Sequence, residues 1–318
     1  MRIGKVDPEI LTGYVFPYLG AQDPDLLIGP VLGEDAAVVR DGDRYLVVAC
    51  DPITGTEVGI GRYVVDINAN DVATMGAEPR YMTITLILPP DRQVYDLERI
   101  TREIDDAAKR LGIAIIGGHT EVTDRVDKPI LVGCALGFTP KPLAGEDVNE
   151  GDVILLTKGA GIEGTSILAQ LYADELRRVG VTEGTITVAR EFSKRLSVVP
   201  EALIAREFCS FMHDPTEGGV LGGLIEISKR TGKGFSIEQG IQVDPVTEQI
   251  CEVLSVDPIK LIGSGALLIV TPADHAETLL NRLHQTDIPA EAIGVITGEP
   301  SEQEIPQDEL WRLIEERT

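Results

Sequence analysis

The hydrophobic and polar positions in the first half of the chain predict strands and helices in alternation. Short apolar runs rich in β-branched residues are typical of strands, and they occur at 31–39, 45–50, 82–88, 113–118 and 130–138. We expect the run IAIIGG at 113–118 to be a short buried strand. Apolar residues recur at helical spacing, which predicts amphipathic helices, in 62–75 and 96–111.

A change of composition separates this half from the rest. The segment TPKPLAGEDVNEGD at 139–152 replaces apolar periodicity with Pro, Gly and acidic residues. Because 318 residues exceed what one core usually serves, we expect two domains, 1–148 and 149–318. Residues 1–32 are rich in turn-forming residues and are expected to be a lead-in arm. The helices expected in the second domain are 165–178, 186–196, 200–208, 244–254, 273–285 and 306–317.

Charge and composition argue against several classes of protein. The 52 acidic and 28 basic side chains give a formal net charge of −24, which disfavours binding to nucleic acid or to an anionic membrane. No apolar run approaches the roughly 20 residues of a membrane-spanning helix, and MRIGKVDPEI does not resemble a signal peptide, so we expect a cytoplasmic protein. The four cysteines (Cys50, Cys134, Cys209 and Cys251) lie far apart in or beside apolar sequence and are expected to be buried, not to bind a metal.

Acidic residues at the ends of hydrophobic elements are the first candidates for chemistry. Asp35 precedes the run AAVV, and Asp51 follows YLVVAC. Asp71 follows Asn70 inside the predicted helix, and GGHTE stands at 117–121. Carboxylates in such places are costly unless a cation neutralises them. Mg²⁺ is commonly held by one or two carboxylates together with nucleotide phosphates, so the pattern predicts an ATP–Mg²⁺ site.

Two glycine-rich turns add candidates in the second half. One lies within DVILLTKGAGIEGTSILAQL (152–171), between a predicted strand and a predicted helix, and contains Lys158 and Gly161. Backbone N–H groups at the start of the next helix could hold a phosphate there, although the sequence is not a Walker A motif. Lys158 could reach that phosphate or be a surface lysine. The other turn, HDPTEGG at 213–219, contains Asp214, which could cap the following helix.

These motifs occur in a fixed order: GEDAAV, a strand ending in Asp51, NDVATMGAEP, GGHTEV, GDVILLTKG and HDPTEGGVLGGLIEI. The series resembles the aminoimidazole ribonucleotide (AIR) synthetase superfamily, and within it the hydrogenase maturation factor HypE. The resemblance implies an α/β (α+β) fold of two domains with ATP in the cleft between them. In this family the N-terminal domain has a four-stranded mixed sheet that forms a barrel across a homodimer, and the C-terminal domain is α+β.

The resemblance, together with the turn residues, also assigns roles to individual side chains. The implied metal ligands are Asp35, Asp51, Asp71 and Asp214. The residues expected to contact the nucleotide are Asn70, Gly117, Gly118, Thr120, Lys158 and Gly161. The implied catalytic residues are Asp35, Asp71 and His119. With ATP and Mg²⁺ as cofactors, they would activate a carbonyl or amide oxygen or transfer phosphate.

The chain departs from the family pattern in three places. Its final residues, WRLIEERT, contain no cysteine, whereas HypE-like proteins carry the reacting carboxamide on a cysteine of their C-terminal tail. His119 stands where HypE-like sequences have Asp, and Glu121 is an alternative ligand. Lys5 alone does not match the N-terminal Cys–Lys pair of selenophosphate synthetase.

Three functions therefore stay open. The first is a HypE-like ATP-dependent enzyme. The second is a phosphotransferase similar to thiamine-monophosphate kinase. The third is a nucleotide-binding scaffold without catalysis in a maturation complex. The expected partners are ATP, an unidentified acceptor, a second copy of the chain and a maturation-factor protein.

Overall fold

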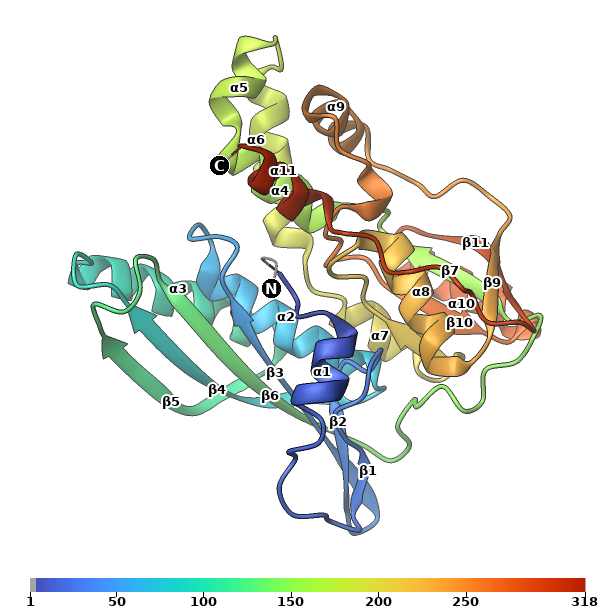
Figure 1. Ribbon diagram of the computed structural model, residues 1–318. Coiled ribbons are helices and arrows are strands. Elements are labelled where there is room, and N and C mark those ends of the chain that lie inside the picture. The colour runs from blue at the N-terminus through green and yellow to red at the C-terminus, as the bar shows by residue number, and fades with distance from the viewer. Residues whose placement is uncertain (1–3, 318) are drawn as a thin grey trace.

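The computed structural model describes residues 4–317 and places one β-sheet in each half of the chain (Figure 1). The first sheet has six strands in the order β1-β2-β3-β6-β4-β5. Its strands are β1 (Leu26–Ile28), β2 (Ala37–Asp41), β3 (Arg44–Ile53), β4 (Glu78–Leu88), β5 (Ala114–Val122) and β6 (Ile130–Thr139). Only β4 and β5 run parallel, so the sheet is mixed, as expected. It has six strands and not four, because the short β1 and β2 extend one edge.

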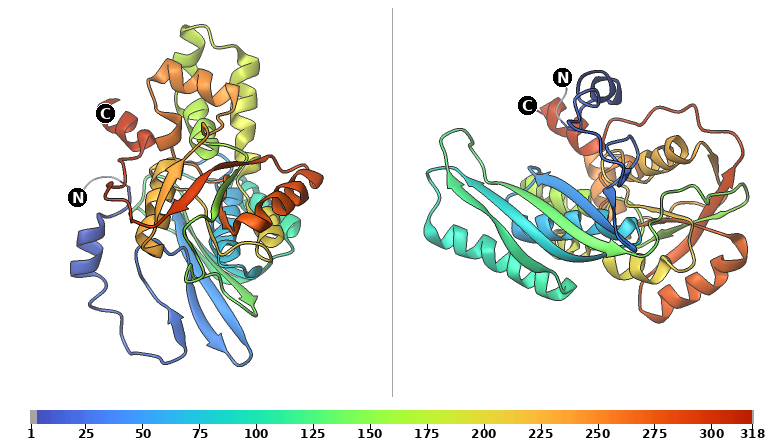
Figure 2. Two further views of the ribbon diagram at one scale, coloured as in Figure 1. Left: turned by 90° about the vertical axis from the view of Figure 1, so that its right-hand side faces the viewer. Right: turned by 90° about the horizontal axis from the view of Figure 1, so that it is seen from below.

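Two helices, α2 (Ile60–Thr74) and α3 (Val94–Leu111), pack on this sheet (Figures 1 and 2). Helix α3 is amphipathic: Ile100, Ile104 and Ala107 are buried, while its charged residues face solvent. Helix α2 is instead buried along almost its whole length, polar residues included. The reason is its position, since α2 contacts β3, β6 and α3 and also reaches α7 and β8 of the second half.

The second sheet is antiparallel throughout, in the order β8-β10-β7-β11-β9. Its strands are β7 (Val153–Thr157), β8 (Phe211–His213), β9 (Gly234–Ile237), β10 (Leu268–Thr271) and β11 (Ala290–Thr297). The α-helices of this half are α4 (Ile162–Leu171), α5 (Ala173–Arg178), α6 (Glu183–Glu191), α7 (Val199–Ala205), α8 (Gly219–Thr231), α9 (Pro245–Leu254), α10 (Ala273–Gln285) and α11 (Glu309–Arg317). The helix expected at 165–178 is two helices, because α4 ends at Leu171 and α5 begins at Ala173.

The first and last described segments lie against each other. The N-terminal arm contains α1 (Pro8–Tyr14), and its Lys5 backbone N–H donates to Glu217 of the second half at 3.0 Å. Gly4 lies so close to α11 that an added Cβ would be 3.1 Å from the Trp311 ring. Figure 2 shows α1 and α11 on the same side of the molecule. The arm therefore bridges the two halves.

One apolar cluster runs through both sheets. It includes Val47 and Leu131 of the first sheet and Leu155 and Ile269 of the second. A smaller cluster joins helices α4, α6, α9 and α11. The domain boundary that we propose at residue 148 lies in the connection between β6 and β7, but the two halves share their main core.

Three expectations from the sequence are wrong in detail. The run IAIIGG is not a buried strand: Ile113 is buried but precedes β5, and β5 is exposed along its whole length at the edge of its sheet. Asp51 does not follow its strand but lies within β3, which continues as Asp51 and Pro52 pair with β6. Cys50 is exposed and Cys134 and Cys209 are only half-buried, so of the four free cysteines only Cys251 is fully buried.

A candidate active site in an acidic cavity

Three aspartates that the sequence places far apart line one cavity of about 270 Å³. Asp35 precedes β2, Asp51 lies in β3, and Asp71 lies in α2. The opposite wall comes from the second half and includes Thr216 and Glu217. The folded chain thus gathers these carboxylates between its two halves, as the proposed nucleotide site requires.

Asp71 lines this cavity and Asp214 does not, but the two carboxyl groups lie near each other and both are buried. Asp71 is 4% exposed and Asp214 only 1%. Among the described residues, neither Oδ2 of Asp71 nor either carboxyl oxygen of Asp214 has a hydrogen-bond partner. Desolvation raises the pKa of Asp71 well above its usual value, and the nearby Asp214 and Asp51 carboxylates raise it further. Desolvation and the Asp35 carboxylate raise the pKa of Asp214 to about 7.

Unpartnered buried carboxylates are costly, so these groups suit a cation. Within residues 4–317, however, no three His, Cys, Asp or Glu side chains already form a cluster that could hold a metal ion. Mg²⁺ needs only one or two protein carboxylates when phosphates and water complete its shell. The donors present therefore fit a Mg²⁺ ion that arrives with a nucleotide better than a permanently bound metal.

His213 fixes the position of Asp35. Its Nδ1 lies 2.9 Å from Oδ1 of Asp35, and its Nε2 lies 2.9 Å from Oε2 of Glu226 on α8. Burial acts to lower the pKa of His213, but the two carboxylates outweigh it and hold the pKa well above the usual value. The charged imidazole therefore ties the loop before β2 to the second half. No spacing pattern pointed to Glu226, whose one signal in the sequence was a charged residue within the apolar stripe of α8.

Lys5 brings a positive charge to the same cavity. Its Nζ donates to Oγ1 of Thr216 at 2.9 Å. Burial acts to lower the pKa of Lys5, but nearby carboxylates, led by Glu226 and Glu217, raise it above the usual value. Part of the side chain stays open to solvent. No spacing rule points to Lys5, because the arm reaches the cavity only through long-range contacts.

Glu163 is a further site residue that the sequence analysis missed. It stands in the first turn of α4, is 7% exposed, and lines the acidic cavity. Its Oε2 has no hydrogen-bond partner among the described residues. Desolvation raises the pKa of Glu163 to about 7. Its signal in the sequence was an acidic residue directly after the glycine-rich turn.

Asn70, expected to contact the nucleotide, instead joins the two halves. Its side-chain N–H donates to the Leu196 carbonyl at 2.9 Å, and its Oδ1 accepts from the Val198 N–H at 2.8 Å. The side chain is fully buried and does not line the acidic cavity. In this arrangement Asn70 holds α2 against the second half.

Lys158 and Gly161 lie in the turn before α4, outside the lining of the cavity. The Lys158 ammonium pairs with Glu201 at 2.6 Å and donates to the Ser197 carbonyl at 2.8 Å. Gly161 has a left-handed φ of 71°, and an added Cβ would lie 3.2 Å from the Pro258 carbonyl oxygen. Both residues are thus occupied by contacts within the protein.

The GGHT segment lies on the exposed strand β5. Gly118 must be glycine there, because an added Cβ would overlap the Ile84 carbonyl oxygen. His119 is exposed, with Nε2 3.4 Å from Oε2 of Glu121. Strand β5 stands three strands from β3, or roughly 14 Å at normal strand spacing. Gly117, Gly118, His119 and Thr120 are therefore apart from the acidic cavity within one chain.

Comparison with known proteins identifies the family. The family model described as AIR synthase related protein, N-terminal domain, matches residues 33–139, and the model of the C-terminal domain matches residues 149–305. The chain therefore belongs to the AIR synthase related family. Within it, the chain is similar to hydrogenase maturation proteins. A protein of Methanocaldococcus jannaschii named for hydrogenase expression/formation is 30% identical over 306 residues, which cover 93% of this chain and 89% of that protein.

Other relatives agree with this placement. The carbamoyl dehydratase HypE of Azotobacter vinelandii is 30% identical over 247 residues, covering 76% of this chain and 70% of that protein. The crystal structure of Escherichia coli HypE has a TM-score of 0.72 at 25% identity, covering 83% of this chain and 86% of that one. The expected fold of two AIR synthase-type domains is thereby confirmed.

Two ligand-bound structures share the fold at lower identity. A HypE structure in complex with ATP has a TM-score of 0.67 at 22% identity and covers 93% of this chain and 87% of that one. AaThiL complexed with AMPPCP and TMP has a TM-score of 0.73 at 17% identity and covers 88% of this chain and 92% of that one.

No helix within residues 4–317 is both long and apolar enough to cross a membrane.

Proposed function

We propose that this protein is an ATP-dependent, Mg²⁺-assisted enzyme related to the HypE-type hydrogenase maturation factors. It would activate a carbonyl or amide oxygen of an acceptor by phosphoryl transfer. The observation that carries this proposal is the meeting of Asp35, Asp51 and Asp71 at one cavity, beside the unpartnered carboxyl of Asp214. The HypE structure with bound ATP and the relative named carbamoyl dehydratase support it.

Each side chain has a role that its contacts suggest. Asp51, Asp71 and Asp214 would hold Mg²⁺, which when bound offsets the charge of the carboxylates and phosphates. Asp35 is held by His213, so its carboxylate keeps one orientation toward the cavity. Lys5 and the Thr216 hydroxyl offer donors at the opposite wall. Positioning and electrostatic stabilisation are the main contributions that a protein makes to phosphoryl transfer.

A separate molecule is the simplest acceptor. The acidic cavity has no cysteine among its lining residues, and no other activated nucleophile of the protein is placed there. We propose direct transfer to a bound acceptor, in contrast to a group carried by the protein itself.

The experiment that tests the proposal measures binding of ATP–Mg²⁺ and single-turnover ATP hydrolysis. Asp71→Asn should weaken ATP–Mg²⁺ binding by about 100-fold, because it removes a charge–charge interaction in a desolvated site. Asp66→Asn is the matched control, since Asp66 is buried on the same helix but pairs with Arg110 and does not line the cavity. Equal affinity of the parent and Asp71→Asn would rule out this site assignment.

Measurements of ATP binding and turnover also distinguish the two alternative functions, a thiamine-monophosphate kinase-like enzyme and a non-catalytic scaffold. A thiamine-monophosphate kinase-like enzyme would phosphorylate thiamine monophosphate, and AaThiL shares the fold. A non-catalytic scaffold would bind ATP–Mg²⁺ without any turnover, alone or with a maturation-factor partner. A HypE–HypF complex is known among the structural neighbours, which supports testing a partner of that kind.

We further propose that β5 pairs with a second copy of the chain. This edge strand exposes Ile115, Ile116 and Val122, and an exposed apolar edge is a template for another strand. Only across such a homodimer could His119 and its neighbours reach a nucleotide. Ile116→Lys should convert a dimer into a monomer in sedimentation equilibrium. A monomeric parent protein would exclude both the dimer and these nucleotide contacts.

A further inference from the structure

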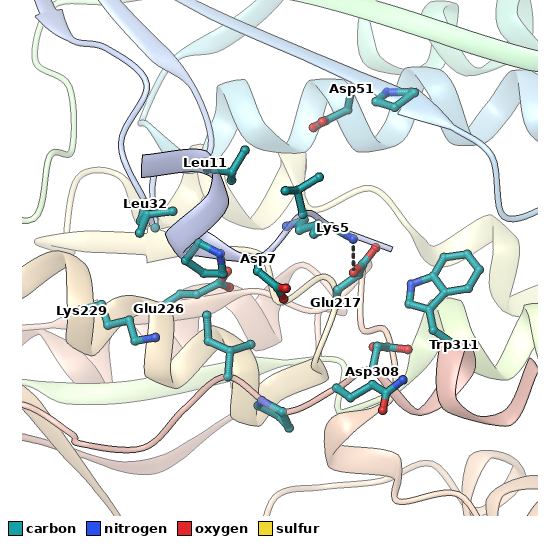
Figure 3. Close-up of a pocket in the computed structure, with 17 residues that line it drawn as sticks. Lys5, Asp7, Leu11, Leu32, Asp51, Glu217, Glu226, Lys229, Asp308 and Trp311 are labelled. Atoms are coloured by element: carbon teal, nitrogen blue, oxygen red, sulfur yellow. Dashed lines mark hydrogen bonds between the residues drawn. The ribbon is translucent and has the colours of Figure 1, made fainter. Parts of the chain in front are cut away.

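A second and larger cavity, of about 670 Å³, adjoins the acidic one (Figure 3). The two share Lys5, Asp51 and Glu217, together with Trp311. A volume of this size is typical of a pocket for a small molecule, and its shared wall puts any occupant next to the proposed phosphate site.

The walls of the two cavities have different origins. The four candidate metal-binding aspartates all lie within the regions that the family models match, 33–139 and 149–305. Most of the larger cavity instead comes from outside those regions: residues 5–11 of the arm, Leu32, and residues 306–311. The acidic cavity is thus built mainly from the part of the chain that the family models match, whereas most residues of the larger one lie outside that part. That difference is expected if the first holds the shared nucleotide and the second holds the acceptor.

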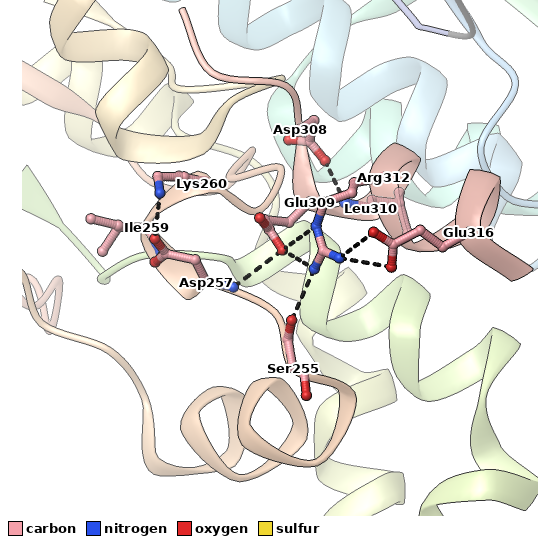
Figure 4. A network of polar contacts seen from close by, with 9 residues as sticks. All are labelled: Ser255, Asp257, Ile259, Lys260, Asp308, Glu309, Leu310, Arg312 and Glu316. Atoms are coloured by element: carbon pink, nitrogen blue, oxygen red, sulfur yellow. Dashed lines mark hydrogen bonds and ion pairs between the residues drawn. The ribbon is translucent and has the colours of Figure 1, made fainter.

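The C-terminal part of this wall is firmly held. Arg312 of α11 donates to the Ser255 carbonyl at 2.9 Å and pairs with Glu309 and with Glu316 (Figure 4). These contacts fix α11 and leave the neighbouring Trp311 ring at the border of both cavities. Its Nε1 is buried and has no hydrogen-bond partner among the described residues.

The lining indicates which chemistry the cavity would accept. Leu11, Leu32 and Pro306 offer an apolar surface. The carboxylates outnumber the cations: Asp7, Asp51, Glu217, Glu226 and Asp308 face only Lys5 and Lys229. Such a lining accepts hydrogen bonds from N–H groups and repels anions.

We propose that the larger cavity is the acceptor site and takes a small molecule that carries the oxygen to be activated together with an apolar body and the N–H groups of an amine or amide, in preference to a carboxylate or phosphate. This inference rests on the proposed function, because it assigns the acceptor of the same site. It also argues against thiamine monophosphate as the acceptor, because the carboxylates of the lining would repel its phosphate.

Three probes of one shape test the inference: benzylamine, benzamide and benzoate. Trp311 is the only tryptophan of the chain, so its fluorescence reports on both cavities. We expect benzylamine and benzamide to change this fluorescence, and benzoate to bind about tenfold or more weakly than benzylamine. Equal binding of benzoate and benzylamine would overturn the proposal.

Two variants locate the probes and separate this inference from the proposed function. Leu32 lines only the larger cavity, and Asp71 only the acidic one. Leu32→Phe should weaken benzylamine binding about tenfold while a non-hydrolysable ATP analogue with Mg²⁺ binds as before. Asp71→Asn should weaken binding of the ATP analogue with Mg²⁺ and leave benzylamine binding as before. Unchanged benzylamine affinity in Leu32→Phe would place the probe elsewhere and refute the acceptor site. Failure of the parent to bind the ATP analogue would refute the proposed function, whatever the probes do.

Discussion

The two adjoining cavities differ in how much their side chains depend on a ligand. In and beside the acidic cavity, Asp71, Glu163 and Asp214 have buried oxygens without partners in the described structure. In the larger cavity, Asp308 accepts hydrogen bonds from the backbone N–H groups of Gly218 and Leu310, each at 2.8 Å. The first cavity therefore holds buried carboxyl groups whose charge a cation would offset, whereas the Asp308 carboxyl of the second already has hydrogen-bond donors within the protein. Unpartnered buried charge therefore indicates, more than cavity size does, where a metal-bound nucleotide would bind.

The largest effect on stability should come from His213, which links the acidic cavity to α8. His213→Gln leaves Asp35 and Glu226 without their shared cation, and breaking a buried ion pair in this way costs about 3–5 kcal/mol of unfolding free energy. Denaturant unfolding measures it. The control is His275→Gln, an exposed histidine of α10 that should change stability by less than about 1 kcal/mol. Similar losses of unfolding free energy in both variants would mean that the contacts of His213 with Asp35 and Glu226 do not stabilise the fold.

Asp214→Asn should have an opposite and somewhat smaller effect. Removing an unpartnered buried charge should raise the unfolding free energy by about 1–3 kcal/mol when no Mg²⁺ is present. The same substitution should weaken ATP–Mg²⁺ binding in a calorimetric titration. A variant that is less stable than the parent, yet binds the nucleotide normally, would show that Asp214 has a structural role instead.

The unfolding free energy of the parent should depend on pH, because buried carboxyl groups in and beside the acidic cavity gain charge as the pH rises. Asp214 and Glu163, each with a pKa of about 7, stay protonated in the folded chain at pH values where the unfolded chain has lost those protons. The unfolding free energy without Mg²⁺ should therefore fall as the pH rises from about 4 to about 7 and then level off. Mg²⁺ should raise Tm more at about pH 8 than at about pH 5 in thermal scans, because only ionised carboxylates bind it. An equal shift at both pH values would argue against these groups as ligands.

The smallest effect that we expect is on the pH dependence of ligand binding in the larger cavity. Burial raises the pKa of Asp308 to about 7, while the Gly218 and Leu310 N–H groups act to lower it. Benzylamine should thus bind a few-fold more tightly at about pH 8 than at about pH 6, as the Asp308 carboxyl becomes charged. Asp308→Asn should remove most of this pH dependence in the fluorescence titration. A pH dependence that persists in the variant would assign the effect to another group.

Local patterns predicted much of the fold and part of the site. The helix spacing of 62–75 and the strand runs around Asp35 and Asp51 were sufficient to bring three aspartates together. Asn70 shows the limit of such reasoning, since neighbouring residues of a helix point about 100° apart. Asp71 faces the cavity, while Asn70 faces the second half. Lys5 and Trp311 could not be predicted at all, because long-range packing of the terminal segments brings them to the site.

The apolar cluster shared by both sheets has a consequence for the integrity of the chain. A cut in the connection between β6 and β7 would give two fragments that each expose part of one common interior. Neither piece would be a self-sufficient folding unit, but the two should reassemble when mixed. Complementation of separately expressed halves would then restore ATP binding, which neither half could support by itself.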